Sequence, residues 1–402
     1  MPAPWNSIIV ANRFLRLIFL QLLSSTFLFI PVVFAIKFLG ENNTQYTAYF
    51  SFATNLTIGF TKLVLIVSRS LDSIKIDSKN LQLITKNEVQ YLFLIIVLQY
   101  FFATLLLEPD FVTLIVMHVG IFSMAIIEFR CQSLFINFRW KEAFKNYFVL
   151  ILIFFGLLII DSSIQGINEK SLLSCWSVST IFVALLVTKK TPKYSKMTET
   201  TNSKVRQNRS YLARDFMINY GLMQLIYSLG TLFTSSQEML KYRVLMFLSI
   251  PTNIVVQAVG TAGLNFIFGD PRDRKFKLLA FDVIAFVPII TTILVFKLIG
   301  SSRISKLLGS MWIQIPNSFS LFLVMSLTSV LLAHTTMIIR WHNLTKSLLG
   351  KRLLFSLIQI PISILSISQF GANGILASLS LFNICFLIIN VWKITASKTS
   401  LL

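Results

Sequence analysis

The chain has 402 residues, of which 55% are hydrophobic and only 13% are charged, whereas a typical soluble domain carries a charge on roughly a quarter of its residues. Its 36 Lys and Arg residues outnumber its 16 Asp and Glu residues, which gives a formal net charge of +20. Nucleic-acid-binding proteins carry such charge over a soluble core, and this chain has too few polar residues to cover one, so its composition indicates a membrane protein.

Long apolar runs without charge recur along the whole sequence, and we expect an all-α polytopic membrane protein with about twelve transmembrane helices. One crossing needs about 20 apolar residues. Strands of a β-barrel would instead alternate in polarity at every second residue, and no such alternation is sustained. The predicted spans are residues 14–36, 47–68, 91–107, 111–128, 146–160, 172–188, 216–236, 243–266, 278–297, 317–339, 353–369 and 373–392.

The basic residues predict the orientation, because Lys and Arg accumulate in cytoplasmic loops. With the N-terminus inside, 28 of the 36 basic residues fall in cytoplasmic segments, 7 fall in external segments and Lys62 lies within a span. A missed or extra span would destroy this bias from that point onward. The pattern therefore predicts twelve spans with both termini in the cytoplasm.

A polar, basic stretch at residues 189–215 divides the spans into two sets of six. We expect an N-terminal lobe at residues 1–188, a cytoplasmic linker at 189–215 and a C-terminal lobe at 216–402. The halves share a faint internal echo: Glu41 and Tyr46 precede a span with Thr54-Asn55, and Glu238 and Tyr242 precede one with Thr252-Asn253. Repeated halves with a substrate site between them are common among transporters, so we expect two pseudo-symmetric lobes around a central cavity.

Polar side chains form stripes at helical spacing in the first two spans of each half. Polar groups are costly in hydrocarbon unless they face water or a partner, so such stripes favour the lining of a cavity. The alternative is that these side chains bind neighbouring helices together. The stripes comprise Arg13, Gln21 and Ser24 or Ser25 in span 1; Asn55, Gly59, Lys62 and Arg69 in span 2; Tyr220, Gln224, Tyr227, Thr231 and Ser235 in span 7; and Asn253, Gln257, Thr261 and Asn265 in span 8.

Charged residues inside the spans are few. Lys62 lies about six residues from the cytoplasmic end of its span, roughly 9 Å deep, where it either reaches the interface along its stem or contacts a ligand. Lys241 and Arg243 open span 8 on the side where basic residues are rare, as interfacial anchors or as ligand contacts. Glu128 and Asp282 are expected to be ion partners at the interface, which leaves no carboxylate at mid-membrane.

No constellation of catalytic residues is present in the sequence, so we expect neither an enzyme nor a bound cofactor or metal. The external loops contain no His, and no nucleophile stands beside a base. The three cysteines, Cys131, Cys175 and Cys385, lie in or beside apolar runs without metal-binding spacing. His118 and His334 are expected to be hydrogen-bonded packing residues.

This layout resembles the multidrug, oligosaccharidyl-lipid and polysaccharide exporter superfamily, and within it bacterial O-antigen or capsule repeat-unit flippases. In sequence, the resemblance rests on SLGTLFTSSQEMLKYRVLMFLSIP at residues 228–251 and NTQYTAYFSFATNL at residues 43–56. Both segments are similar to the family's pattern of a short external turn, an aromatic residue and a second helix. The resemblance covers nearly the whole chain.

The resemblance implies a flippase in the bacterial cytoplasmic (inner) membrane that moves a polyprenyl-diphosphate-linked oligosaccharide to the outer leaflet for surface polysaccharide synthesis. Its partners would be this lipid-linked substrate, anionic lipids, a polysaccharide polymerase and a chain-length regulator, and no nucleic acid. In such families basic residues face the diphosphate and polar residues face the sugars. The implied diphosphate contacts are Lys62, Arg243, Lys241 and Arg13, and the implied sugar contacts are Asn55, Gln224, Asn253, Gln257 and Asn265.

Other membrane proteins remain as alternatives. A polysaccharide polymerase has a similar number of spans but a large external loop, whereas the longest loop here is predicted to be cytoplasmic. A drug or ion antiporter of the same superfamily is disfavoured by the lack of an acid at mid-membrane. A major-facilitator transporter is disfavoured because the loop between spans 2 and 3 lacks its signature, and a scaffold without transport activity stays open.

Overall fold

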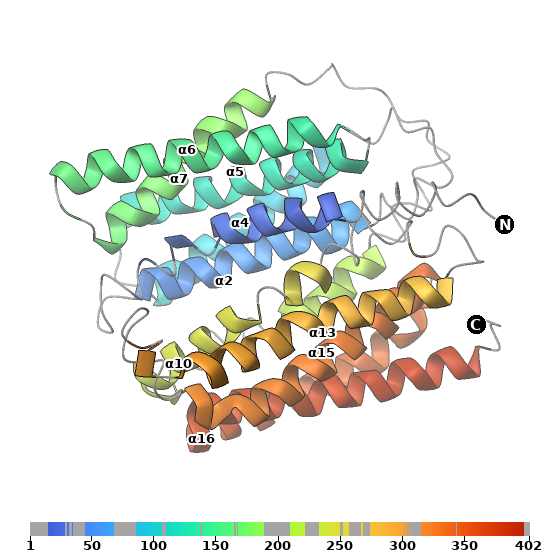
Figure 1. Cartoon of the computed structure of the whole chain (residues 1–402). Coiled ribbons are helices and arrows are strands. Elements are labelled where there is room, and N and C mark those ends of the chain that lie inside the picture. The colour runs from blue at the N-terminus through green and yellow to red at the C-terminus, as the bar shows by residue number, and fades with distance from the viewer. Residues whose placement is uncertain are drawn as a thin grey trace, which may run out of the picture. The chain divides into compact units, whose positions relative to one another are not determined.

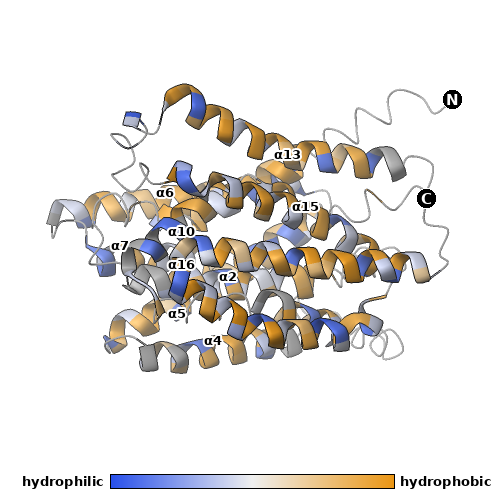
Figure 2. Cartoon of the chain, turned by 90° about the horizontal axis from the view of Figure 1, so that it is seen from below, coloured by the Kyte–Doolittle hydropathy of each residue, from blue (hydrophilic) through white to orange (hydrophobic). Residues whose placement is uncertain are grey.

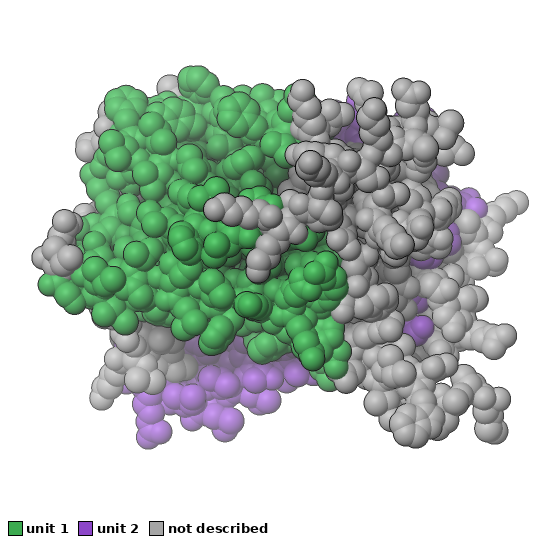
Figure 3. All heavy atoms as spheres, turned by 90° about the horizontal axis from the view of Figure 1, so that it is seen from above, with its two compact units in different colours: residues 1–209 green, residues 210–402 purple. Residues whose placement is uncertain are grey.

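The computed structural model describes residues 15–28, 30, 31, 34, 45–67, 86–106, 110–136, 139–164, 166, 168–188, 210–221, 233–249, 252–256, 267, 274–300, 302, 303, 305, 315–342 and 344–397. Every element in these residues is a helix, and none of them forms a β-strand (Figure 1). The chain divides into an N-terminal unit, Met1–Arg209, and a C-terminal unit, Ser210–Leu402 (Figure 3). The boundary between the units falls inside the predicted linker.

The N-terminal unit is a bundle in which α5 packs against α6, α7, α2 and α4. Figure 1 shows α5, α6 and α7 lying side by side. The helix at residues 15–28 opens the unit. Its further elements are α2 (Gln45–Phe60), the π-helical η1 (Thr61–Ile66), α4 (Lys86–Leu106), α5 (Phe111–Ile136), α6 (Trp140–Ile164) and α7 (Glu169–Thr188).

In the C-terminal unit, α15 packs against α16 and α13, and α10 packs against α16. A helix at residues 210–216 opens this unit, so the last residues of the predicted linker are helical. Its further elements are η3 (Met217–Gly221), α10 (Ser236–Leu248), α13 (Arg274–Ile299), η5 (Ile315–Ser318), α15 (Phe319–Trp341) and α16 (Thr345–Ala396).

Seven described helices are long and apolar enough to cross a membrane, and two shorter apolar helices, Leu15–Leu28 and Val89–Phe101, coincide with predicted spans 1 and 3. The 52-residue α16 contains predicted spans 11 and 12. Gly371, with φ 55° and ψ −131°, interrupts it between them. The chain is therefore an all-α polytopic membrane protein, while spans 7 and 8 lie partly outside the described residues.

Apolar side chains remain exposed on one face of several helices, as expected for contact with lipid. Only 28% of the apolar stretch of α6 and 22% of that of α13 is buried, so both helices expose most of their apolar side chains. Figure 2 shows α13 as apolar along most of its length. Six of its exposed apolar residues follow one another at intervals of three or four residues: Leu279, Val283, Val287, Ile290, Leu294 and Leu298.

The close approach of α5 and α7 depends on Gly120. A Cβ atom at this position would lie 2.7 Å from the backbone Cα of Ser177 on α7. We expect Gly120→Ala to lower the free energy of unfolding by about 1–3 kcal/mol, because the backbones must separate to accept the methyl group. Gly156→Ala on α6, where a Cβ would meet nothing within 4 Å, is the matched control and should be neutral or slightly stabilising in the same thermal-unfolding assay.

Asp110 caps the N-terminus of α5. Its carboxylate accepts hydrogen bonds from the backbone N–H of Thr113 at 3.2 Å and from the Thr113 hydroxyl at 3.1 Å. It also lies 2.7 Å from the ammonium of Lys170. The hydrogen bond from Lys170, followed by that from Thr113, lowers the pKa of Asp110 below its ordinary value.

We expect Asp110→Ala to lower stability by about 1 kcal/mol at neutral pH, because both the cap and the ion pair are lost. Asp110→Asn keeps a capping oxygen and should lose less. Since the pKa of Asp110 is lowered on folding, the contribution of its charge is complete above its unfolded pKa and is lost as the pH falls through the folded value. Unfolding midpoints measured between neutral and acidic pH should therefore converge for the wild type and Asp110→Asn in acid.

Candidate functional site

The ammonium of Lys62 lies inside the N-terminal unit and does not reach its surface. Lys62 belongs to η1, and its side chain is 2% exposed. Its Nζ lies 3.2 Å from Oε1 of Glu128 on α5. It also donates hydrogen bonds to Gln21 Oε1 at 2.8 Å and to Ser24 Oγ at 3.3 Å, both in the first helix. Lys62 is thus held by a buried polar network, and its stem does not extend to the interface.

Glu128 is the counter-charge of this network and is fully buried. Its carboxylate accepts hydrogen bonds from Ser24 Oγ at 2.7 Å, from Gln132 Nε2 at 3.0 Å and from the hydroxyl of Tyr147 on α6. Glu128 is an ion partner, as expected, but its partner is Lys62 of η1 and both side chains are buried inside the unit. The helix continues past the predicted end of span 4, because α5 extends to Ile136.

The described part of the network contains one positive and one negative charge, and two of its buried polar atoms lack a described hydrogen-bond partner. Lys62 and Glu128 cancel one another's charge, which is the usual requirement for burying either group. Within the described part of the chain, Gln21 Nε2 is a buried donor without an acceptor and Gln132 Oε1 is a buried acceptor without a donor. Such orphaned atoms are rare in folded proteins and mark a place where water or a polar ligand can bind.

Lys62 lies in the π-helical segment η1, where the helix is wider than an α-helix. A π-turn inside an α-helix is often found at functional sites. The end of α2, which precedes η1, is held by the side chain of Gln99 on α4. Thr57 Oγ1 donates to Gln99 Oε1 at 3.1 Å, and Gln99 Nε2 donates to the carbonyl of Ala53 at 3.1 Å. Further out, the hydroxyl of Tyr49 lies 2.9 Å from Nε2 of His118. His118 is therefore the hydrogen-bonded packing residue that the sequence predicts.

The two Asn residues of the internal echo occupy matching local environments. Asn55 Nδ2 donates to Ser51 Oγ at 3.5 Å, at the long limit of a hydrogen bond, and Asn253 Nδ2 donates to Ser249 Oγ at 3.0 Å. Both Asn side chains are half-buried. In each half the Ser precedes the Asn by four residues, and the two Ser-Asn pairs stand 198 residues apart in the chain. The two halves therefore share this hydrogen bond from an Asn to the Ser four residues before it, in addition to the short motifs that they share in sequence.

The remaining predicted site residues are only partly visible. Lys241 is 8% exposed, and its Nζ lies 3.8 Å from Glu238 Oε1. Glu238 also accepts a hydrogen bond from the backbone N–H of Ala372 at 2.8 Å, beside the break in α16. Arg243 belongs to α10, but its side chain is not described. Arg13, Gln224, Gln257 and Asn265 lie outside the described residues.

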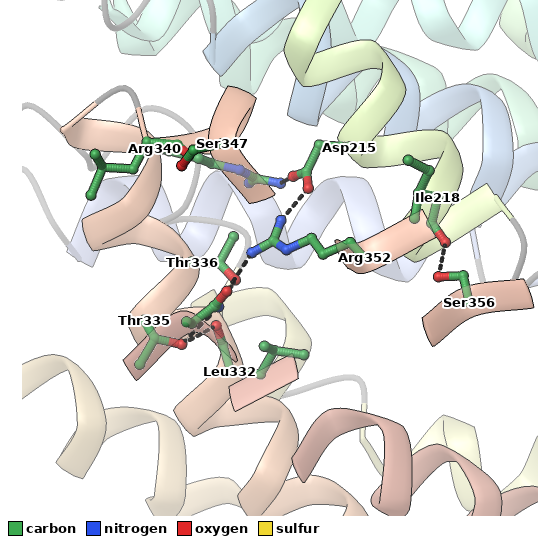
Figure 4. A network of polar contacts seen from close by, with 11 residues as sticks. Asp215, Ile218, Leu332, Thr335, Thr336, Arg340, Ser347, Arg352 and Ser356 are labelled. Carbon is green, nitrogen blue, oxygen red and sulfur yellow. Dashed lines mark hydrogen bonds and ion pairs between the residues drawn. The ribbon is translucent and has the colours of Figure 1, made fainter. Parts of the chain in front are cut away.

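The C-terminal unit contains charged groups whose partners the sequence did not reveal. The carboxylate of Asp282 on α13 lies 2.8 Å from Nδ1 of His334 on α15, so the partner of Asp282 is a histidine of another helix. Asp215, predicted to end the linker, is fully buried between Arg340 and Arg352 (Figure 4). A buried charge needs a counter-charge. A charged residue inside a predicted helix could therefore have been matched with an oppositely charged residue of another helix.

Comparisons with solved structures identify the fold, whereas comparisons of sequence do not. No family model matches the sequence, and no curated protein sequence matches it either. Solved structures do match. A MATE transporter in complex with MaD5 is 12% identical, with a TM-score of 0.67 over 97% of each chain.

Two further solved structures agree with the first. A MOP superfamily transporter from Pyrococcus furiosus is 12% identical, with a TM-score of 0.65 over 98% of this chain and 96% of the other. The eukaryotic MATE transporter AtDTX14 is 12% identical, with a TM-score of 0.62 over 98% and 97%. The chain therefore has, over nearly its whole length, the fold of transporters of the MOP superfamily, the superfamily that its sequence resembles.

Proposed function

We propose that the chain is a membrane transporter that works by alternating access and flips a polyprenyl-diphosphate-linked oligosaccharide across the cytoplasmic membrane of a bacterium. The observation that carries the transporter proposal is the shared fold, which extends over 97% or more of this chain in each of the three solved transporters described above. The flippase proposal is based on the resemblance in sequence. Its site residues are the polar and basic residues of the first two spans of each half.

The residues of the proposed substrate site fall into two classes. Asn55 and Asn253 present half-buried amides at repeated positions, and amides can donate hydrogen bonds to sugar hydroxyls and accept them. Lys241 and Arg243, in the middle of α10, supply positive charge for a diphosphate. Lys62 would contribute in a different way, because its ammonium already binds Glu128. We propose that it keeps the first two helices of the N-terminal unit and α5 in one arrangement.

A drug or ion antiporter is the second candidate, and Glu128 favours it. The sequence had disfavoured an antiporter because it showed no acid at mid-membrane. Glu128 is an acid inside α5, fully buried and in contact with a lysine, and such a carboxylate could exchange a proton or a cation during transport. In addition, one of the matching structures is a multidrug resistance MATE family transporter, with a TM-score of 0.62 and 10% identity.

Reconstitution of the purified full chain into proteoliposomes tests the two functions side by side. One assay follows the exposure of a polyprenyl-diphosphate-linked oligosaccharide to a glycosidase added outside. The other follows the uptake of a fluorescent organic cation driven by an imposed proton or sodium gradient. Oligosaccharide translocation without cation uptake supports the flippase, the reverse result supports the antiporter, and the absence of both activities would contradict the transporter proposal.

Variants then test the substrate site. We expect Arg243→Ala and the pair Asn55→Leu/Asn253→Leu to reduce translocation at least about tenfold, which corresponds to about 1.4 kcal/mol. Arg303→Ala is the matched control, since Arg303 is an exposed basic residue of another predicted external segment. Equal activity of Arg243→Ala and Arg303→Ala would remove Arg243 from the site.

A further inference from the structure

Three charged side chains meet inside the C-terminal unit. Asp215 comes from the helix at residues 210–216, Arg340 from the end of α15 and Arg352 from the beginning of α16 (Figure 4). Arg352 Nη1 donates to Asp215 Oδ1, and Arg340 Nη2 lies 3.4 Å from Asp215 Oδ2. We refer to Asp215, Arg340 and Arg352 as the triad.

The triad carries one positive charge too many. Two guanidinium groups share one carboxylate. Asp215 is fully buried, Arg352 is 1% exposed, and the side chain of Arg340 is 10% exposed. A buried charge without a counter-charge is costly, and arginine does not lose its proton to avoid that cost. A further anion would neutralise the excess charge, and the described part of the chain does not supply one.

The remaining contacts of Arg352 are neutral. Its Nη2 donates to Asn390 Oδ1 at 2.7 Å. The amide nitrogen of Asn390 in turn donates to Thr335 Oγ1 at 3.1 Å and to Thr336 Oγ1 at 3.2 Å. Asn390 thus fixes the direction of the Arg352 guanidinium without neutralising it.

The two guanidinium groups also keep unused donors. Nε of Arg340 and Nε of Arg352 are buried and have no hydrogen-bond acceptor in the described part of the protein. Arginine offers N–H donors in a planar fork that matches the oxygens of a phosphate group. Positive charge and unsatisfied donors therefore coincide in the same cluster.

The triad is accessible at one end. Arg340 is its least buried member and lies one residue before the end of α15. The next helix begins with exposed basic residues: Lys346 Nζ lies 5.6 Å from the ring centre of Tyr211, and Lys351 Nζ lies 3.6 Å from that of Trp392. Basic residues gathered between transmembrane helices can bind anionic headgroups.

We propose that the triad is an anion site that binds a phosphate group, which enters at Arg340 and accepts hydrogen bonds from the guanidinium groups. The same chemistry can come from free phosphate or from the headgroup of an anionic phospholipid. The site is independent of the transported substrate, and it does not include the residues of the proposed substrate site.

Thermal unfolding of the purified full chain in detergent tests the site. Inorganic phosphate is compared with gluconate at equal ionic strength, and dioleoylphosphatidylglycerol is compared with dioleoylphosphatidylcholine in mixed micelles. We expect phosphate, phosphatidylglycerol or both to raise the unfolding midpoint of the wild type. A shift with inorganic phosphate identifies free phosphate as a ligand, and a shift with phosphatidylglycerol alone identifies a lipid headgroup.

Arg340→Gln should abolish this shift while the protein stays folded, because it leaves the neutral pair Asp215–Arg352. Lys346→Gln is the matched control and should keep the shift, since it removes an exposed charge from the same end of the unit. If Arg340→Gln is poorly folded, Arg340→Lys, which keeps the charge but loses the planar fork, should weaken the shift. No shift in the wild type, or an equal loss in Arg340→Gln and Lys346→Gln, would overturn the proposal.

Discussion

Replacing Glu128 with Gln is expected to lower the free energy of unfolding by about 3–5 kcal/mol. The substitution removes the Glu128 carboxylate from the buried ammonium of Lys62, and breaking one side of a buried ion pair has a cost of this size. It also weakens the acceptor for Ser24, Gln132 and Tyr147. Thermal and denaturant unfolding in detergent, followed by circular dichroism, measures the loss.

The double variant Lys62→Met/Glu128→Gln separates the pair from its surroundings. It removes both charges, so we expect a smaller loss of stability than in either single variant. Glu142→Gln is the matched control, because Glu142 forms an ion pair with Arg139 in which both side chains are about half exposed, and it should cost less than about 1 kcal/mol. If the losses of the two single variants simply add up in the double variant, Lys62 and Glu128 do not stabilise one another.

Asp215→Asn is expected to have an effect of similar size in the C-terminal unit, about 3–5 kcal/mol. It removes the carboxylate between two buried guanidinium groups, which then repel one another without a counter-charge. A low yield of folded protein and a lower unfolding midpoint are the expected results. The measurement is size-exclusion chromatography followed by thermal unfolding.

A second substitution checks the cause of this loss. Asp215→Asn/Arg352→Met returns the cluster to a single excess positive charge, as in the wild type, and should recover part of the stability. Asp110→Asn removes an acid from an ion pair whose lysine, Lys170, is about half exposed, and it serves as the control. A wild-type unfolding midpoint in Asp215→Asn would mean that the triad contributes nothing to the stability of the unit.

The sequence predicted the helices well where hydropathy alone decides. The predicted break between spans 11 and 12 contains Gly371, at which α16 is interrupted. The predicted span 5, residues 146–160, lies within α6. Both features depend on local properties, namely the length of an apolar run and the composition of its ends.

Predictions failed where a charged residue was taken as the end of a span. Span 4 was expected to stop at residue 128, and the linker was expected to continue to residue 215. In the structure α5 continues past Glu128 to Ile136, and Asp215 lies buried in a helix. A charge marks the membrane boundary only while it has no partner, and both of these residues have one.

Of the candidate site, the sequence pointed to Lys62, Gln21 and Ser24, but it did not pair Lys62 with Glu128. Lys62 stood out because it is a lysine in an apolar run, and Asn55 and Asn253 stood out through the internal echo. Glu128 stood out as an acid at the end of a predicted span, but nothing linked it to Lys62, and Gln132 and Tyr147 carried no comparable signal. Their role follows only from the packing of α5 and α6 against the first helix and η1.

Hydropathy and the distribution of basic residues act locally along the chain, so they were sufficient to predict a helical membrane protein of two halves. Which charges are neutralised depends on how the helices pack. Lys62 and Glu128 stand 66 residues apart, and Asp215 and Arg352 stand 137 residues apart. A buried charge is stable only beside its partner, and which residue becomes that partner is fixed by the packing of helices that are distant in sequence.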